Sequence, residues 1–158
     1  MATEIERKFL VLNDSYKKEA FRSTTIIQGY LASVPGCTVR VRVRNEQGFI
    51  TIKGASLAGS IARYEWEKEI PGNEARELLS LCANRYIEKT RYEVEAGEFV
   101  FEVDEFHGAN EGLVVAEIEL NTETDEFEKP SWLGREVTGD KRYYNSRLTK
   151  QPYLQWEK

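Results

Sequence analysis

The sequence has few cysteines and no long apolar run, and these shortages limit what the protein can be. Cys37 and Cys82 are the only cysteines, so neither a disulfide framework nor a metal site with paired cysteines is indicated. The charged first residues lead into no apolar stretch, so neither a signal peptide nor a membrane partner is expected. The net charge of −5 argues against a nucleic-acid partner. A cytoplasmic protein follows as the expectation.

The chain also lacks any internal division. No repeat, low-complexity linker or shift in composition separates one part from another. Hydrophobic residues make up 41% of the 158 positions and charged residues 31%, which is typical of a globular chain rather than a disordered one. This length can bury a sizeable core, so one domain over residues 1–158 is predicted.

Strand patterns dominate the chain. Alternating or β-branched runs are separated by turn sequences such as VPGC at 34–37 and NEQG at 45–48. Short links of this kind favour antiparallel neighbours. The strands are predicted at residues 3–12, 25–33, 37–45, 48–54, 62–70, 85–95, 98–106 and 112–120.

Helix patterns are fewer. Four are predicted: from Asn13, over 72–84, from Thr122, and over 140–150 before Pro152. Asn73 and Asp140 are the candidate caps of the second and the last. Asp125 lies three residues after Thr122, which is a weak form of the capping box.

Charged residues recur at every second position in nearly every predicted strand. Glu4, Glu6 and Lys8 share one face of the first strand, because successive strand side chains point to opposite faces. A solvated sheet face explains any one such strand. It explains the whole set less well, because the alternation is strict and several strands carry mainly one sign. The later strands contribute Arg40, Arg42 and Arg44; Thr51 and Lys53; Arg63, Glu65, Glu67 and Glu69; Lys89 and Arg91; Glu102 and Asp104; and Glu117 and Glu119.

Eight strands are enough to close a barrel. If the charged faces point inward, they line a polar tunnel, and the apolar faces point outward where helices can cover them. The predicted fold is therefore mainly β (α+β): a closed eight-stranded antiparallel barrel with a charged interior. A few helices, including a C-terminal one, are expected to cover it.

An interior of both signs indicates a particular chemistry. Crowded carboxylates repel one another unless a cation joins them, and hard divalent ions such as Mg²⁺ or Mn²⁺ prefer oxygen ligands. Arginine and lysine in the same cavity would bind an anion, and the arginine fork fits phosphate oxygens. Metal, cations and carboxylates together are typical of phosphoryl transfer, and a polyphosphate would use them all.

The motifs that carry these residues resemble a known family. EIERKFLV at 4–11 is similar to the E-x-E-x-K signature of the triphosphate tunnel metalloenzymes, the CYTH superfamily. VRVRVR, ITIKG, IEKTRYEV, VVAEIEL and PSWLGREVTGDKRYYNSRL follow in matching order over nearly the whole chain. The compact length resembles the short bacterial, tripolyphosphatase-like branch.

The resemblance implies a closed eight-stranded tunnel that hydrolyses a triphosphate with Mg²⁺ or Mn²⁺. The metal ligands it implies are Glu4, Glu6, Glu102, Asp104, Glu117 and Glu119. The substrate-binding residues it implies are Lys8, Tyr30, Arg40, Arg42, Lys53, Arg63, Lys89 and Arg91. Glu65 and Glu67 would orient the attacking water or complete a second metal site, and Lys141 would reach a terminal phosphate.

Inorganic tripolyphosphate is the small-molecule substrate that the resemblance favours, since no stretch is visibly dedicated to a nucleobase. Other functions stay open at this point. They are a class IV-type adenylyl cyclase that converts ATP to cyclic AMP and pyrophosphate, a thiamine triphosphatase, and a binding module without catalysis. The oligomeric state is also open, a homodimer included.

Overall fold

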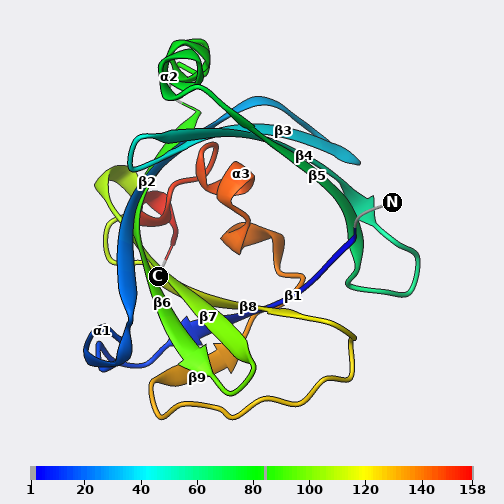
Figure 1. Ribbon diagram of the computed structural model, residues 1–158, viewed down its shortest axis with the longest axis vertical. Helices are drawn as coiled ribbons and strands as arrows, with labels where there is room; N and C mark the ends of the chain where they lie inside the picture. The colour runs from blue at the N-terminus through cyan, green and yellow to red at the C-terminus, as the bar shows by residue number, and fades with distance from the viewer. Residues whose placement is uncertain (1–2, 84, 158) are drawn as a thin grey trace.

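The computed structural model describes residues 3–83 and 85–157, and its backbone is dominated by one antiparallel sheet that closes on itself (Figure 1). The strands are β1 (Thr3–Val11), β2 (Arg22–Val34), β3 (Cys37–Arg44), β4 (Gln47–Ser56), β5 (Arg63–Ile70), β6 (Tyr86–Ala96), β7 (Phe99–Phe106), β8 (Val114–Leu120) and β9 (Leu133–Glu136). Eight of them form a ring in the order β1-β5-β4-β3-β2-β6-β7-β8, and β8 pairs with β1 again. The predicted barrel is confirmed.

Strand β1 closes the ring by pairing on both of its edges. Its first residues lie beside β5, with Thr3 opposite Tyr64, while its middle pairs with β8. Beyond the end of β5, the short strand β9 takes the free edge of β1, with Phe9 opposite Glu136. The sequence reading did not include β9, because its four residues, LGRE, carry no alternating pattern.

The tight hairpins follow the predicted turn sequences. Gly36 has a φ of 83° at the β2–β3 turn, and Asn45 has a φ of 56° at the β3–β4 turn. Glycine and asparagine tolerate this left-handed region better than other residues do. The VPGC and NEQG sequences therefore set the short antiparallel links.

Two of the three apolar clusters lie on the outside of the ring, and the third joins Ile87, Phe106 and Val115, on the inward strand faces, to Tyr143 and Leu148 of the C-terminal segment. The largest cluster covers the outward faces of β1, β6, β7 and β8, and its centre is Trp132, which is fully buried against Phe101 and Tyr16. A second cluster packs Val41 and Val43 of β3 under a helix. This arrangement leaves the rest of the inward faces free to carry charge.

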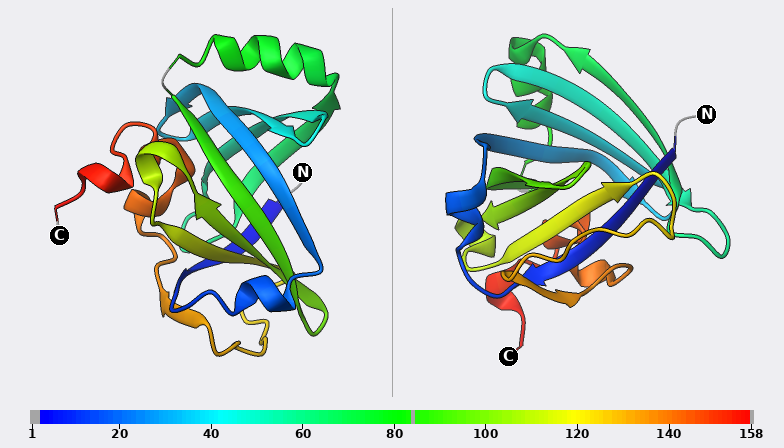
Figure 2. Two further views of the ribbon diagram at one scale, coloured as in Figure 1. Left: turned by 90° about the vertical axis from the view of Figure 1, so that its left-hand side faces the viewer. Right: turned by 60° about the horizontal axis from the view of Figure 1, so that its bottom comes forward.

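Helix α2 (Gly72–Ser80) lies outside the ring across β2, β3 and β4 (Figure 2). It begins after Pro71, so the predicted cap at Asn73 is wrong. The other helical segments are short: α1 (Tyr16–Glu19), η1 (Gly108–Asn110), η2 (Lys141–Tyr143), α3 (Asn145–Leu148) and η3 (Tyr153–Gln155).

Two helix predictions need correction. The segment from Thr122 is not helical, because Asp125 accepts hydrogen bonds from the backbone N–H groups of Asn121 and Thr122 and forms a turn. The C-terminal helix is broken into η2 and α3 by Tyr144, whose ψ of 132° is extended. Asp140 does cap η2, since its side chain accepts from the backbone N–H of Arg142. No helix in the described part of the chain is long and apolar enough to span a membrane.

Candidate active site

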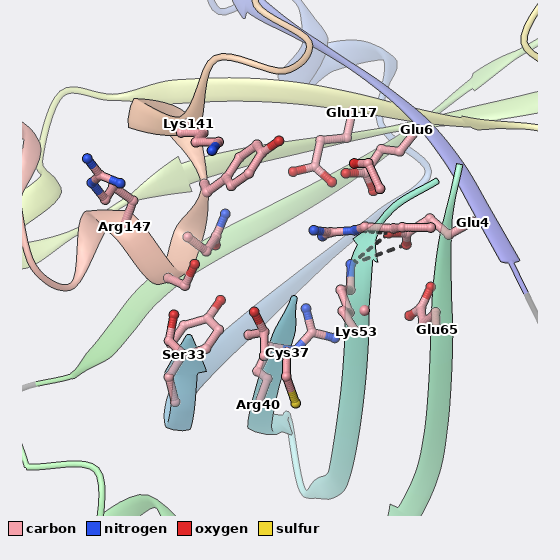
Figure 3. Close-up of a pocket in the computed structure, with 18 of the residues that line it drawn as sticks. Glu4, Glu6, Ser33, Cys37, Arg40, Lys53, Glu65, Glu117, Lys141 and Arg147 are labelled. Carbon is pink, nitrogen blue, oxygen red and sulfur yellow. Dashed lines mark hydrogen bonds and ion pairs between the residues drawn. The ribbon is translucent and has the colours of Figure 1, made fainter. Parts of the chain in front are cut away.

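A cavity of about 610 Å³ occupies the interior of the barrel (Figure 3). Inward-facing side chains of all eight ring strands line it, together with the segment around α3. Every residue that the resemblance assigned to the site lines this cavity except Asp104. Strand alternation and ring closure thus bring together positions as distant in sequence as Glu4 and Lys141.

The antiparallel register places charged positions of neighbouring strands opposite one another. Glu6 of β1 lies opposite Glu119 of β8, and Lys8 lies opposite Glu117. Directly opposite side chains on one face are close neighbours, so these charges interact. In the lining of the cavity, some carboxyl groups therefore lie next to lysines and others lie next to a second carboxyl group.

Glu6 and Glu117 form one carboxyl pair. The pKa of Glu6 is raised well above its ordinary value, because burial disfavours its charge and Glu117 repels it. Burial also opposes the charge of Glu117, but Lys8, at 3.6 Å, and a hydrogen bond with Glu6 outweigh it and lower the pKa. The pKa values of the two neighbouring carboxyl groups are therefore pushed apart.

Glu4 and Glu65 form a second pair. Burial opposes the charge of Glu4, yet Lys53, whose Nζ lies 2.9 Å from Oε1, and a hydrogen bond with Glu65 lower its pKa to about 2. Burial and the hydrogen bond with Glu4 raise the pKa of Glu65 to about 7. Arg63 adds a third contact to Glu4, at 3.4 Å.

These carboxyl pairs fit a divalent cation by their chemistry. Where two neighbouring carboxyl groups have pKa values pushed apart, a hard cation could balance the charge of both. Glu119 beside them also has a raised pKa, first through partial burial and then through Glu4 and Glu102. Among residues 3–83 and 85–157, no three acidic, histidine or cysteine side chains converge as a ready metal cluster.

On another part of the wall, Arg42 is buried and held by a neutral partner. Its Nε and Nη2 donate to Oε1 of Gln28 at 2.9 and 2.6 Å. Burial, and after it Arg40 and Arg91, lower the pKa of Arg42 to about 9. The neighbouring Arg40 has a buried Nε with no hydrogen-bond partner among the described residues. Both guanidinium groups therefore suit an anion in the cavity.

Asp104 lies behind the cavity wall. Its Oδ1 and Oδ2 accept hydrogen bonds from Arg91 Nε and Nη2 at 2.8 and 2.9 Å, and Lys89 Nζ lies 2.8 Å from Oδ2. It is 1% exposed, and no part of it lines the cavity. In this arrangement Asp104 holds two cations in place on the inward face that it shares with Glu102, and these cations cover it from the cavity.

The residues that the sequence reading missed come from β2 and from the broken C-terminal helix. Asn145 Oδ1 accepts hydrogen bonds from Gln28 Nε2 and Lys89 Nζ. Tyr144 lies inside the cavity with Lys8 Nζ 5.1 Å from the centre of its ring. The alternation of β2 puts Gln28 on the same face as Tyr30, so strand periodicity could have found it. Nothing in the sequence pattern indicated that the chain would turn inward at Tyr144.

One mouth of the cavity is basic. Lys141, Arg147 and Lys150 approach it from the C-terminal segment, and the end of β2 and the start of β3 form the opposite side (Figure 3). A second cavity, of about 450 Å³, lies at the other end of β2 and shares Glu102 and Glu119 with the first. Glu93, Glu98 and Arg22 also line it, with Arg22 Nε 2.7 Å from Glu93, so acidic side chains outnumber basic ones at this end.

Comparison with known families identifies the architecture. The model of the CYTH domain matches residues 2–152. The chain belongs to the CYTH domain family. Among similar proteins, an inorganic triphosphatase of Acetivibrio thermocellus is 52% identical over 154 residues, with 97% of each chain covered. An inorganic triphosphatase of Nitrosomonas europaea is 36% identical, with 92% of this chain and 96% of that one covered.

Solved structures agree with this placement of the CYTH domain. A crystal structure of an inorganic triphosphatase superposes with a TM-score of 0.66 at 33% identity, covering 92% of this chain and 97% of that one. A protein from Pyrococcus horikoshii, at 23% identity and a TM-score of 0.59, shares the fold.

Proposed function

We propose that this CYTH protein hydrolyses inorganic tripolyphosphate in its tunnel with the help of a divalent cation, Mg²⁺ or Mn²⁺. The observation that carries the proposal is that one cavity contains both paired carboxyl groups and buried cations such as Arg42. The relatives named inorganic triphosphatases, at 52% and 36% identity over most of the chain, support the same activity.

Glu4, Glu6, Glu117 and Glu119 would hold the cation, with Glu102 beside them. A bound divalent ion would neutralise charge on the phosphate oxygens during the reaction. Asp104, which the resemblance placed in this set, is proposed instead to orient Lys89 and Arg91, because these two cations occupy both of its oxygens.

The phosphate chain would lie along the cationic side chains of the cavity. These are Lys8, Arg40, Arg42, Lys53, Arg63, Lys89 and Arg91, with Lys141 at the mouth and Tyr30 on the wall. Their charges would stabilise the negative charge that spreads over the transferred group. Because they are positioned before the substrate arrives, little reorganisation is needed.

Glu65 and Glu67 would orient the attacking water. Glu67 is itself held by a hydrogen bond of 2.7 Å from Thr51. The water oxygen bonds to a terminal phosphorus while the bond from that phosphorus to the bridging oxygen breaks. The products are one orthophosphate and one pyrophosphate. The unpaired Cys37 and Cys82 fit a reducing compartment, so the proposal includes a cytoplasmic location.

Product analysis tests this function directly. Tripolyphosphate, ATP and thiamine triphosphate are offered separately with Mg²⁺ and then Mn²⁺, and phosphate, pyrophosphate and cyclic AMP are measured. The expected result is rapid phosphate release from tripolyphosphate, slow release from the other two, and none without a divalent ion. Cyclic AMP from ATP, or turnover restricted to thiamine triphosphate, would contradict the proposal.

A pair of variants separates the site from a general effect of charge. Glu117→Gln should lower kcat/KM for tripolyphosphate by at least about 100-fold, because it removes a proposed ligand of the cation. Glu128→Gln is the matched control, since Glu128 is exposed on the segment between β8 and β9. It should leave kcat/KM unchanged.

A further inference from the structure

Gln28 occupies an unusual place in the tunnel wall. It is fully buried, and its side-chain amide forms hydrogen bonds with three other side chains. Oε1 accepts both hydrogen bonds from Arg42, while Nε2 donates to the hydroxyl of Tyr30 at 2.9 Å and to Asn145 at 3.1 Å. A buried amide with this many partners has a single allowed orientation.

The neutrality of this partner distinguishes Arg42 from most cations around it. Lys8 lies 3.6 Å from Glu117, Lys53 lies 2.9 Å from Glu4, and Arg91 lies 2.8 Å from Asp104. Arg42 makes no ion pair with any carboxylate of the described residues. Gln28 thus fixes the guanidinium group of Arg42 in place without neutralising the positive charge of Arg42.

Asn145 is a second neutral amide that accepts a hydrogen bond from a cation, and it links this cation to Gln28. Its Oδ1 accepts from Gln28 and, at 2.8 Å, from Lys89. Residues from β2, β3, β6 and α3 are therefore joined in one network through two neutral amides. A carboxylate in either position would make the same hydrogen bonds to the cations but would cancel charge.

We propose that Gln28 and Asn145 are positioning residues: Gln28 holds Arg42 for a polyphosphate through neutral hydrogen bonds, so that substrate rather than protein balances the charge of Arg42, and Asn145 orients Gln28 and gives Lys89 a neutral acceptor beside its ion pair with Asp104. This inference rests on the proposed function and extends it to how the site selects polyanions. The attraction between charges in a partly buried site is several times stronger than in water. An added negative charge beside these cations would therefore compete directly with the phosphate oxygens.

Isosteric acidic variants test the proposal. Asn145→Asp keeps the Oδ1 acceptor that serves Lys89 and Gln28, and changes only the charge. Gln28→Glu keeps the acceptor that serves Arg42 but loses the Nε2 donor to Tyr30 and Asn145, so Asn145→Asp is the cleaner test of charge. Each should raise the Kd for tripolyphosphate, measured by calorimetry in metal-free buffer, and the KM by at least about 10-fold. The melting temperature should stay within a few degrees of that of the wild type, because the cations remain paired.

Two further variants complete the design. Gln28→Met fills a similar volume without an acceptor, so Arg42 loses its two hydrogen bonds to Gln28. We expect kcat to fall and KM to rise. Gln155→Glu adds the same charge at an exposed position on η3 and should change neither constant.

The outcomes separate this inference from the proposed function. If both acidic variants bind tripolyphosphate within threefold of the wild type, the amides are structural and the inference is wrong. If the wild type binds tripolyphosphate but does not hydrolyse it, the proposed function is wrong, and the binding constants still decide the role of Gln28. If the wild type does not bind it, both are wrong.

Discussion

Lys89 illustrates how one side chain responds to the interior of the tunnel. Burial lowers its pKa to about 7, even though Asp104 lies 2.8 Å away and favours the charged form. Arg91 and Arg42 add to the decrease by repulsion. Near neutral pH the lysine is therefore balanced between its neutral and charged forms.

Binding of a polyanion should shift that balance. A phosphate chain beside Lys89 favours the ammonium, so its pKa rises and a proton is taken up. At pH 8, where the free lysine is mostly neutral, binding of tripolyphosphate should take up nearly one proton per site at Lys89. At pH 6 the lysine is already charged and this uptake disappears. Calorimetry in two buffers with different ionisation enthalpies measures the difference.

Lys89→Met provides the comparison for this measurement, because tripolyphosphate itself exchanges protons on binding. Subtracting the proton count of the variant from that of the wild type isolates the lysine. An identical count at pH 8 for the two proteins would show that Lys89 does not titrate in response to the ligand.

At this scale the sequence was informative wherever a residue lay in a regular strand. The positions of Glu4, Glu6 and Lys8 on the inward face follow from alternation alone. The opposite pKa shifts of Glu6 and Glu117 do not, because they depend on which strands meet when the ring closes. The position of Asp104 behind the wall likewise depends on Lys89 and Arg91 from a neighbouring strand.

At the scale of elements, α2 can lie close to the sheet because glycine faces it. A Cβ atom on Gly48 of β4 would lie 2.6 Å from Cβ of Ala75 and 3.0 Å from the carbonyl oxygen of Ile70. Gly29 of β2 is similarly close to Cys82. These contacts leave no room for a methyl group.

Gly48→Ala should therefore lower the free energy of unfolding by about 1–3 kcal/mol, the usual cost of overpacking. Urea denaturation measures it. Helix α2 lies outside the tunnel, so kcat/KM of the folded fraction should not change.

A double-mutant cycle identifies the contact responsible. Ala75→Gly makes room beside the new methyl group, so Gly48→Ala should cost at least about 0.5 kcal/mol less in that background. Equal costs in both backgrounds would assign the effect to the backbone at Ile70 instead.

The sequence predicted the long elements better than the short ones. The eight ring strands and α2 have periodic patterns over many residues, and they were found. The turn around Asp125 carries a capping pattern that its side chain uses for a turn instead of a helix. The C-terminal helix is interrupted at Tyr144 because the chain there turns into the cavity, which local propensity cannot indicate.

At the scale of the whole molecule, the binding site exists only when the ring is closed. Its cations come from strands on every side, and the unfolded chain has no comparable site. A ligand of the tunnel therefore binds the folded state alone and stabilises it.

Tripolyphosphate at 100 times its Kd should add about 2.7 kcal/mol to the free energy of unfolding. For a chain of this size, this corresponds to a rise in melting temperature of roughly 5–10 °C. Differential scanning calorimetry measures it, with sodium sulfate at matched ionic strength as the control. An equal rise with sulfate would mean that general screening, and no specific site, stabilises the barrel.

The acidic cavity at the far end of β2 affects the route by which phosphate can leave the barrel. Because Glu93, Glu98, Glu102 and Glu119 surround that opening, it repels phosphate ions while leaving room for water. The two cavities meet at Glu102 and Glu119, and the acidic one disfavours anions. The phosphate product is therefore expected to leave through the same basic mouth by which the substrate enters, so product release must precede binding of the next substrate.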